Sequence, residues 1–174
     1  FTPRASEGKT VVYLPRDIEQ IVIKETGIPQ AKGRFAQNEA IRSVVRSLGL
    51  NKLIIPRSRL YKQYLIEERL HISTDPGYNA TLYLSHPELF DELARQMTRL
   101  FQNAYIDYLV EKNKDDDHLV RIRYDNIPFL VKEEGKLSVD IGLIDLERSS
   151  VGTNLKSVSH RLYILSSLFP LHAS

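Results

Sequence analysis

Two aspartates late in the chain, Asp125 and Asp145, stand beside two apolar runs that are separated by the turn "KEEGK". Asp125 comes just before a predicted strand around residues 129–131, and Asp145 directly follows a second one, residues 141–144. Paired carboxylates can hold a divalent cation and accept a proton. An ordinary turn accounts for "YDNIP" equally well, because Asp, Asn and Pro favour turns for backbone reasons. Asp145 is the more specific candidate, since a charge that directly follows a buried strand needs a partner.

The length and composition set the frame for any such site. A chain of 174 residues is predicted to form one domain, or one domain with two small lobes, and is long enough for a hydrophobic core. There is no cysteine, which excludes disulfides and cysteine metal sites. We expect a cytoplasmic protein, with export into a host cell as the open alternative, because many secreted bacterial proteins also lack cysteine. No apolar run approaches the roughly 20 residues that span a bilayer, so no membrane span is expected.

The charges are nearly balanced, with 24 basic and 22 acidic side chains and a net charge of +2. Such a surface gives no strong attraction to nucleic acid or anionic lipid. One local basic cluster comprises Lys52, Arg57, Arg59 and Lys62. No nucleic-acid reading motif accompanies it, so we expect no nucleic-acid partner and keep a nucleic-acid-binding module only as a distant alternative.

The first seventy residues alternate between β-rich runs and one helical pattern. Apolar residues from Phe35 to Leu48 recur near helical spacing, and Gly49 is a plausible helix end. Pro56 separates two later β-rich runs. The predicted order is therefore strand, strand, helix, strand, strand, over residues 10–14, 21–24, 35–48, 52–55 and 60–66.

The second part of the chain is predicted to begin with a turn-rich connection, residues 73–84. A long helix follows within residues 85–110, with a capping box formed by Ser85 and Glu88. Two strands around 129–131 and 141–144 come next, and a short tail helix is stopped by Pro170. The apolar stripe of the long helix is expected to be core: Leu89, Leu93, Met97, Leu100, Ala104 and Tyr108.

Five short motifs, in this order along the chain, resemble those of the protein-kinase-like superfamily: "IVIK", "QNEAI", "YLIEERL", "RYDNIP" and "LIDLE". "IVIK" resembles the third-strand motif, and "RYDNIP" a degenerate "HRDLKP" catalytic loop. "LIDLE" resembles the metal-binding "DFG" motif, and still more the "IDFE" form of small-molecule and antibiotic kinases. The resemblance runs from about residue 9 to residue 147, and the order of the motifs carries it.

This resemblance implies a role for each matching residue in a site that binds ATP and Mg²⁺. Lys24 would hold phosphate oxygens, and Glu39 on the following helix would position that lysine. Asp125 would orient the accepting hydroxyl group, and Asp145 would be the Mg²⁺ ligand. The backbone of residues 66–69, which includes Glu67 and Glu68, would meet the adenine ring.

Two features of the family pattern are missing. No G-x-G-x-x-G precedes the strand at residues 10–14, where Gly8 is the single glycine of "ASEGKT". The asparagine expected after the catalytic loop falls by spacing on Leu130, and Asn126 lies too near Asp125 to take the same place in an unchanged loop. These departures keep open a pseudokinase, which retains the fold to bind a partner protein.

We therefore predict an α+β, protein-kinase-like fold. Residues 1–70 would form a lobe with a small antiparallel sheet and one helix, and residues 71–174 a reduced, mainly helical lobe. The predicted function is an ATP- and Mg²⁺-dependent phosphotransferase acting on a protein or small-molecule acceptor. The alternative is a pseudokinase that serves as a protein-binding scaffold without phosphoryl transfer.

Overall fold

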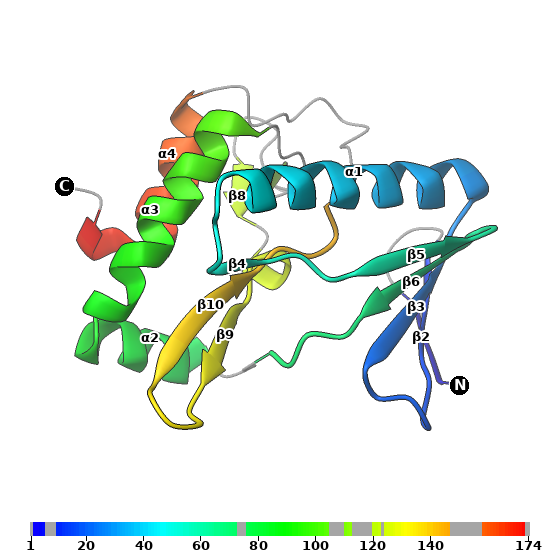
Figure 1. The fold of residues 1–174 in the computed structure, drawn as a ribbon, viewed down its shortest axis with the longest axis horizontal. Helices are drawn as coiled ribbons and strands as arrows, with labels where there is room; N and C mark the ends of the chain where they lie inside the picture. The colour runs from blue at the N-terminus through cyan, green and yellow to red at the C-terminus, as the bar shows by residue number, and fades with distance from the viewer. Residues whose placement is uncertain are drawn as a thin grey trace.

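The structure of this chain is a computed structural model that describes residues 2–5, 10–72, 76–104, 110–112, 120–122, 124–146 and 158–172. These residues form an α+β arrangement of four α-helices with one larger and two smaller sheets (Figure 1). Within them, no helix combines the length and the apolar character that crossing a membrane requires.

The larger sheet is antiparallel and has five strands in the order β1-β2-β3-β6-β5. β3 and β6 are neighbours although α1 and two strands separate them in sequence. The strands occupy one end of the molecule (right in Figure 1). Their bounds are β1 Thr2–Ala5, β2 Val11–Leu14, β3 Ile21–Glu25, β5 Ser58–Tyr61 and β6 Tyr64–Glu68.

Helix α1 (Ile28–Ser47) covers one face of this sheet and extends across the top of the molecule towards the other helices (Figure 1). Gly27 precedes it in an extended conformation, and Pro29 lies in its first turn, where its missing N–H costs no hydrogen bond. Its buried residues Ala31, Asn38 and Ile41 share one helical face. The same helix therefore connects the larger sheet to the rest of the core.

A second, three-stranded sheet has the order β4-β10-β9. β9 (Phe129–Lys132) and β10 (Ser138–Gly142) form an antiparallel hairpin, and β4 (Leu53–Ile54) pairs in parallel with β10. β4 comes from the chain between α1 and β5, so residues before position 70 contribute a strand to the sheet that ends near Asp145.

The remaining described elements are three helices, one short hairpin and two 3-10 turns. The hairpin consists of β7 (Val110–Lys112) and β8 (Val120–Ile122). The others are α2 Pro76–Ser85, α3 Glu88–Asn103, η1 Tyr124–Asn126, α4 Val158–Leu168 and η2 Pro170–His172.

The hydrophobic core lies where α3, α4 and the second sheet meet, and it includes Ile41 of α1. From the predicted stripe, Leu93, Met97 and Leu100 are completely buried. Edge-to-face ring contacts join Tyr83 to Phe90 and Phe90 to Phe129 at centroid distances of 4.8 and 5.3 Å. The prediction that the stripe of the long helix is core is thus confirmed for these three residues; Tyr108 lies outside the described residues.

Four local predictions are wrong. The connection at residues 73–84 contains α2, and Ser85 ends that helix instead of capping α3, which has no side-chain cap hydrogen bond. The single strand predicted over residues 60–66 is the hairpin of β5 and β6, which turns at Lys62 with a φ of 53°. A strand, β1, also precedes the one that we expected to be first.

Truncation of a core residue should be costly. Leu100 is 0 % exposed, and Leu100→Ala is expected to lower the free energy of unfolding by about 2–5 kcal/mol, through lost burial and a residual cavity. Leu84, at 69 % exposure, is the matched control, and Leu84→Ala should change stability by less than about 0.5 kcal/mol. Urea denaturation of both variants measures the difference, and equal effects would contradict the described core.

Candidate functional site

The centre of the candidate site is the ammonium group of Lys24, which forms ion pairs with two carboxylates. Lys24 Nζ contacts a carboxylate oxygen of Glu67 and donates a hydrogen bond to Oδ1 of Asp145. The side chains of Lys24 and Glu67 are 11 % and 4 % exposed, whereas that of Asp145 is 37 % exposed. The sequence separates Lys24 from Asp145 by 121 positions, and the fold brings them into contact.

Strand register places Lys24 and Glu67 on the same face of the larger sheet. Lys24 of β3 lies opposite Leu65 of β6, and Val22 lies opposite Glu67. Because side chains alternate between the two faces of a strand, all four of these residues project to one side. That side is the one covered by α1.

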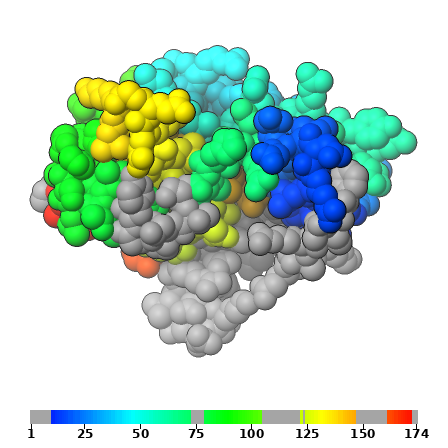
Figure 2. Space-filling view, turned by 90° about the horizontal axis from the view of Figure 1, so that it is seen from below, coloured from blue at the N-terminus to red at the C-terminus, as the bar shows by residue number. Residues whose placement is uncertain are grey.

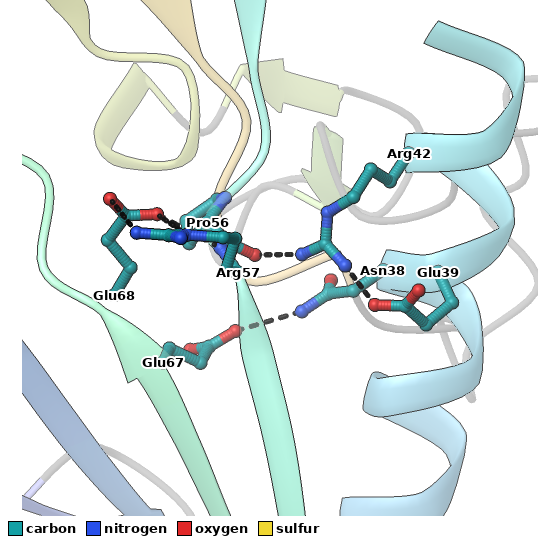
Figure 3. Close-up of polar contacts among 7 residues, drawn as sticks. All are labelled: Asn38, Glu39, Arg42, Pro56, Arg57, Glu67 and Glu68. Carbon is teal, nitrogen blue, oxygen red and sulfur yellow. Dashed lines mark hydrogen bonds and ion pairs between the residues drawn. The ribbon is translucent and has the colours of Figure 1, made fainter. Parts of the chain in front are cut away.

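Helix α1 contributes an amide to the site. Asn38 is buried, and its Nδ2 donates a hydrogen bond of 2.9 Å to Oε1 of Glu67 (Figure 3). Glu39, which we expected to position Lys24, is exposed and pairs with Arg42, whose other guanidinium nitrogen donates to the carbonyl of Pro56 (Figure 3). The predicted pair of Lys24 with Glu39 is therefore replaced by a pair with Glu67, since Glu39 lies one position away from the face that meets the sheet.

Sequence reasoning missed Asn38, although a signal for it was present. Asn38 lies three residues after Phe35 and three before Ile41, so it falls on the apolar stripe of the helix. A polar side chain on such a stripe is expected to find a hydrogen-bonding partner inside the fold. Glu67 was predicted only as part of the backbone stretch that would meet the adenine ring, and the signal for its inward side chain was its spacing of two from the apolar Leu65.

Asp145 is held just beyond β10 in an unusual backbone conformation. Its φ is 54°, in the left-handed region that non-glycine residues rarely adopt. The neighbouring residues are fixed: Ile144 N–H donates to the Asn126 carbonyl at 3.0 Å, and Leu143 N–H to the Ile54 carbonyl at 2.9 Å. The nearby Leu143 and Leu146 are buried, and in this backbone conformation the side chain of Asp145 reaches Lys24.

Asp125 lies on η1, and its side chain is exposed. The hydrogen bond from Ile144 N–H to the Asn126 carbonyl joins the segment that carries Asp125 to the one that carries Asp145. A second hydrogen bond, from Gly142 N–H to the Pro128 carbonyl at 2.8 Å, connects the same two segments. The two aspartates with which we began thus belong to adjacent segments of one loop cluster. Leu130, where the family pattern has an asparagine, is buried in β9.

The stretch predicted to meet an adenine ring runs from the end of β6 into the connection to α2. Glu68 pairs with Arg57 through its side chain, and its N–H donates to the Arg57 carbonyl at 2.8 Å (Figure 3). Arg69 N–H donates to the Gln20 carbonyl at 2.7 Å, which ties this stretch to the β2–β3 hairpin. The side chain of Glu67 is directed to Lys24, so these two glutamates have different surroundings.

The same stretch also approaches β10. A Cβ added at Gly142 would lie 2.9 Å from Leu70 Cδ1 and 3.1 Å from Pro128 Cγ, so a larger residue there would require these side chains to shift. In the space-filling view, residues near position 70 (green-teal) lie between the β9–β10 hairpin (yellow) and the β2–β3 hairpin (blue) (Figure 2). The chain after β6 thus joins the two sheets beside the candidate site.

The electrostatics of the cluster keep Lys24 charged. Burial lowers the pKa of Lys24, but the charges of Glu67 and Asp145 and the hydrogen bonds to them raise it, and the net pKa lies above its ordinary value. The ammonium and the two carboxylates together carry one more negative than positive charge when all are ionised.

The chemical groups in this cluster suit a nucleotide with a divalent cation. Lys24 offers an ammonium group for phosphate oxygens, and the partly exposed carboxylate of Asp145 offers oxygen ligands. Among the described residues, no three His, Asp or Glu side chains gather as an all-protein metal cage would require. Mg²⁺ needs only one or two carboxylates beside substrate phosphates, so the donor set fits that cation.

Comparison with known proteins adds no relative: no protein-family model, curated protein or solved structure matches this chain.

Removing the ammonium group of Lys24 should destabilise the fold more than the loss of an exposed ion pair does, because it leaves a buried carboxylate without its partner. Lys24→Met leaves Glu67 buried with an unpaired charge and is expected to lower the free energy of unfolding by about 3–5 kcal/mol. Adding Glu67→Gln removes that charge while keeping an acceptor for Asn38, so the double variant should recover part of the loss. Urea denaturation of the single and double variants measures this. Arg57→Met, at an exposed ion pair, is the control and should cost at most about 1 kcal/mol.

Alkaline pH should weaken the fold through the same lysine. Since the pKa of Lys24 is higher in the folded than in the unfolded chain, its contribution is complete below about pH 10.4 and is lost as the pH rises through the folded-state value. Lys24→Arg keeps its charge throughout this range. The free energy of unfolding should be measured from about pH 8 to about pH 12, a range that brackets the ordinary pKa of lysine. It should fall more steeply with pH for the wild type than for Lys24→Arg. Parallel curves would contradict a raised pKa.

Proposed function

We propose that this chain is an ATP- and Mg²⁺-dependent phosphotransferase of the protein-kinase-like type. The observation that carries the proposal is the contact of Lys24 with Asp145, two residues from motifs far apart in the sequence. Both belong to the motifs through which the chain resembles that superfamily, and a third-strand lysine beside the metal-binding aspartate is what its chemistry needs.

The roles follow from the positions of the side chains. Lys24, fixed at the end of β3, would bind phosphate oxygens and orient the phosphoryl group. Bound Mg²⁺ would supply neutralisation of the negative charge that develops during transfer. Asp145 would hold that ion, and the exposed Asp125 on the adjacent segment would accept a hydrogen bond from the acceptor hydroxyl group.

A pseudokinase scaffold is the second candidate function, and specific observations favour it. Leu130 is a buried apolar residue at the position where a second metal-binding asparagine would be expected. Lys24 is already paired with two carboxylates, an arrangement that is stable without a ligand. In this alternative the fold is kept for binding a partner protein, with or without nucleotide.

Nucleotide binding provides the first test of the proposal. ATP with Mg²⁺, at 100 times its dissociation constant, should stabilise the fold by about 2.7 kcal/mol, measured as a rise in Tm. Asp145→Asn should lose the part of this rise that depends on Mg²⁺ and all transfer of the γ-phosphoryl group. Its Tm without nucleotide should change little, since asparagine also tolerates a positive φ and accepts hydrogen bonds.

Transfer and binding together separate the two candidate functions. Transfer of ³²P from ATP to the chain itself or to an added acceptor, lost in Asp125→Asn and Asp145→Asn, would support the phosphotransferase. Nucleotide binding without transfer would support the pseudokinase. The absence of any shift in Tm at millimolar ATP with Mg²⁺ would contradict the phosphotransferase.

A further inference from the structure

The two carboxylates that pair with Lys24 differ in how firmly each is held. Glu67 lies on a strand that is bonded on both sides, by β3 and β5, and its side chain is 4 % exposed. It also accepts the 2.9 Å hydrogen bond from the buried Asn38 of α1. Moving Glu67 away from Lys24 would break this hydrogen bond and leave a buried charge unpaired.

Asp145 is held less firmly. It lies after the end of β10, in a left-handed conformation, with a side chain that is more than a third exposed. Because its carboxylate is far more exposed to solvent than that of Glu67, its release from Lys24 costs less than the release of Glu67 would.

We infer that Glu67 and Asn38 are the positioning residues of Lys24, and that Asp145 is an exchangeable partner that a bound phosphate replaces. This inference rests on the proposed function. The phosphate takes the place of Asp145 at the ammonium group while Glu67 stays, and Asp145 becomes available to a divalent cation. No covalent bond changes in this exchange.

The exchange makes the nucleotide and the cation depend on each other. ATP alone must compete with Asp145 for Lys24 and meets a cluster with a surplus negative charge. Mg²⁺ alone must compete with Lys24 for Asp145. Each ligand removes the competitor of the other, so Mg²⁺ should tighten ATP binding by a factor in the usual allosteric range, about 5- to 150-fold.

Helix α1 takes part through a neutral amide and not through a carboxylate. A shift of α1 would therefore loosen the hydrogen bond that orients Glu67 but would leave the ion pair of Lys24 with Glu67 in place. The lysine of this site is thus positioned mainly by the sheet, with the helix as support.

Binding of ATP, measured by titration calorimetry in EDTA and in Mg²⁺, tests the exchange. In the wild type, Mg²⁺ should lower the dissociation constant of ATP by about 5- to 150-fold. In Asp145→Asn, ATP in EDTA should bind more tightly than it does to the wild type, because Lys24 has lost its competitor, and the effect of Mg²⁺ should be much smaller. Weaker binding of ATP in EDTA by Asp145→Asn would overturn the exchange.

The positioning role has a separate readout that needs no nucleotide. The ¹⁵Nζ signal of Lys24 in the labelled protein should stay protected from solvent exchange in Asp145→Asn and Glu39→Gln. It should be lost in Glu67→Gln and broadened in Asn38→Leu. The opposite pattern, with loss in Asp145→Asn and retention in Glu67→Gln, would overturn the assignment.

Two further points keep the outcomes distinct. If Glu67→Gln does not fold, Glu67→Asp replaces it, and the shortened carboxylate should shift the Lys24 signal further than Asp145→Asn does. If the wild type binds ATP in neither buffer, the proposed function and the exchange are both overturned. The Lys24 signal then still decides whether Glu67 and Asn38 position the lysine.

Discussion

A buried ammonium group is the constraint on which much of this structure depends. Lys24 projects from the centre of a five-stranded sheet towards the covering helix, where an unpaired charge would be very unfavourable. Its two carboxylate partners come from β6 and from the loop after β10. The ion pairs therefore connect the larger sheet to the second sheet, in the same region where Leu70 packs on Gly142 and β4 pairs with β10.

The partners of Lys24 also explain why α1 carries a polar residue on its buried face. Ala31 and Ile41 on that face are apolar, and Asn38 is the exception. Its amide satisfies an oxygen of Glu67 that the single ammonium group of Lys24 does not fully occupy. Replacement of Asn38 by an apolar residue would leave that oxygen without this donor. The helix and the sheet are therefore joined by a buried hydrogen bond in addition to apolar packing.

The sequence predicted the elements with strong periodicity and missed those set by long-range pairing. The hairpin of β2 and β3, the helix before Gly49, the long helix and the hairpin that ends near Asp145 follow from local apolar patterns. The pairing of β4 with β10 has no local signal, since a two-residue strand is defined only by its neighbour. The turn at Lys62 was missed because no glycine or asparagine marks its positive φ.

The same distinction applies to the site. Short motifs predicted Lys24 and Asp145 as site residues, but they did not predict which carboxylate pairs with the lysine inside the fold. Glu39 lies on α1, which follows β3 in the chain, and Glu67 lies on β6, which pairs with β3; the rotation of α1 and the register of β6 decide between them. One residue of register separates Glu67 from Glu68, which faces Arg57 instead.

The left-handed conformation of Asp145 is best understood together with its ion pair. A non-glycine residue pays about 1–2 kcal/mol for this backbone, so the surrounding structure must favour it. The buried Leu143 and Leu146 and the bonds of residues 143 and 144 fix the chain on both sides, and the ammonium group of Lys24 attracts the side chain between them. The backbone is thus held by apolar packing and by hydrogen bonds that do not involve Lys24, so its conformation does not depend on the ion pair alone. A partner held in this way is suited to exchange, whereas Glu67, whose position depends on burial and on Asn38, is not.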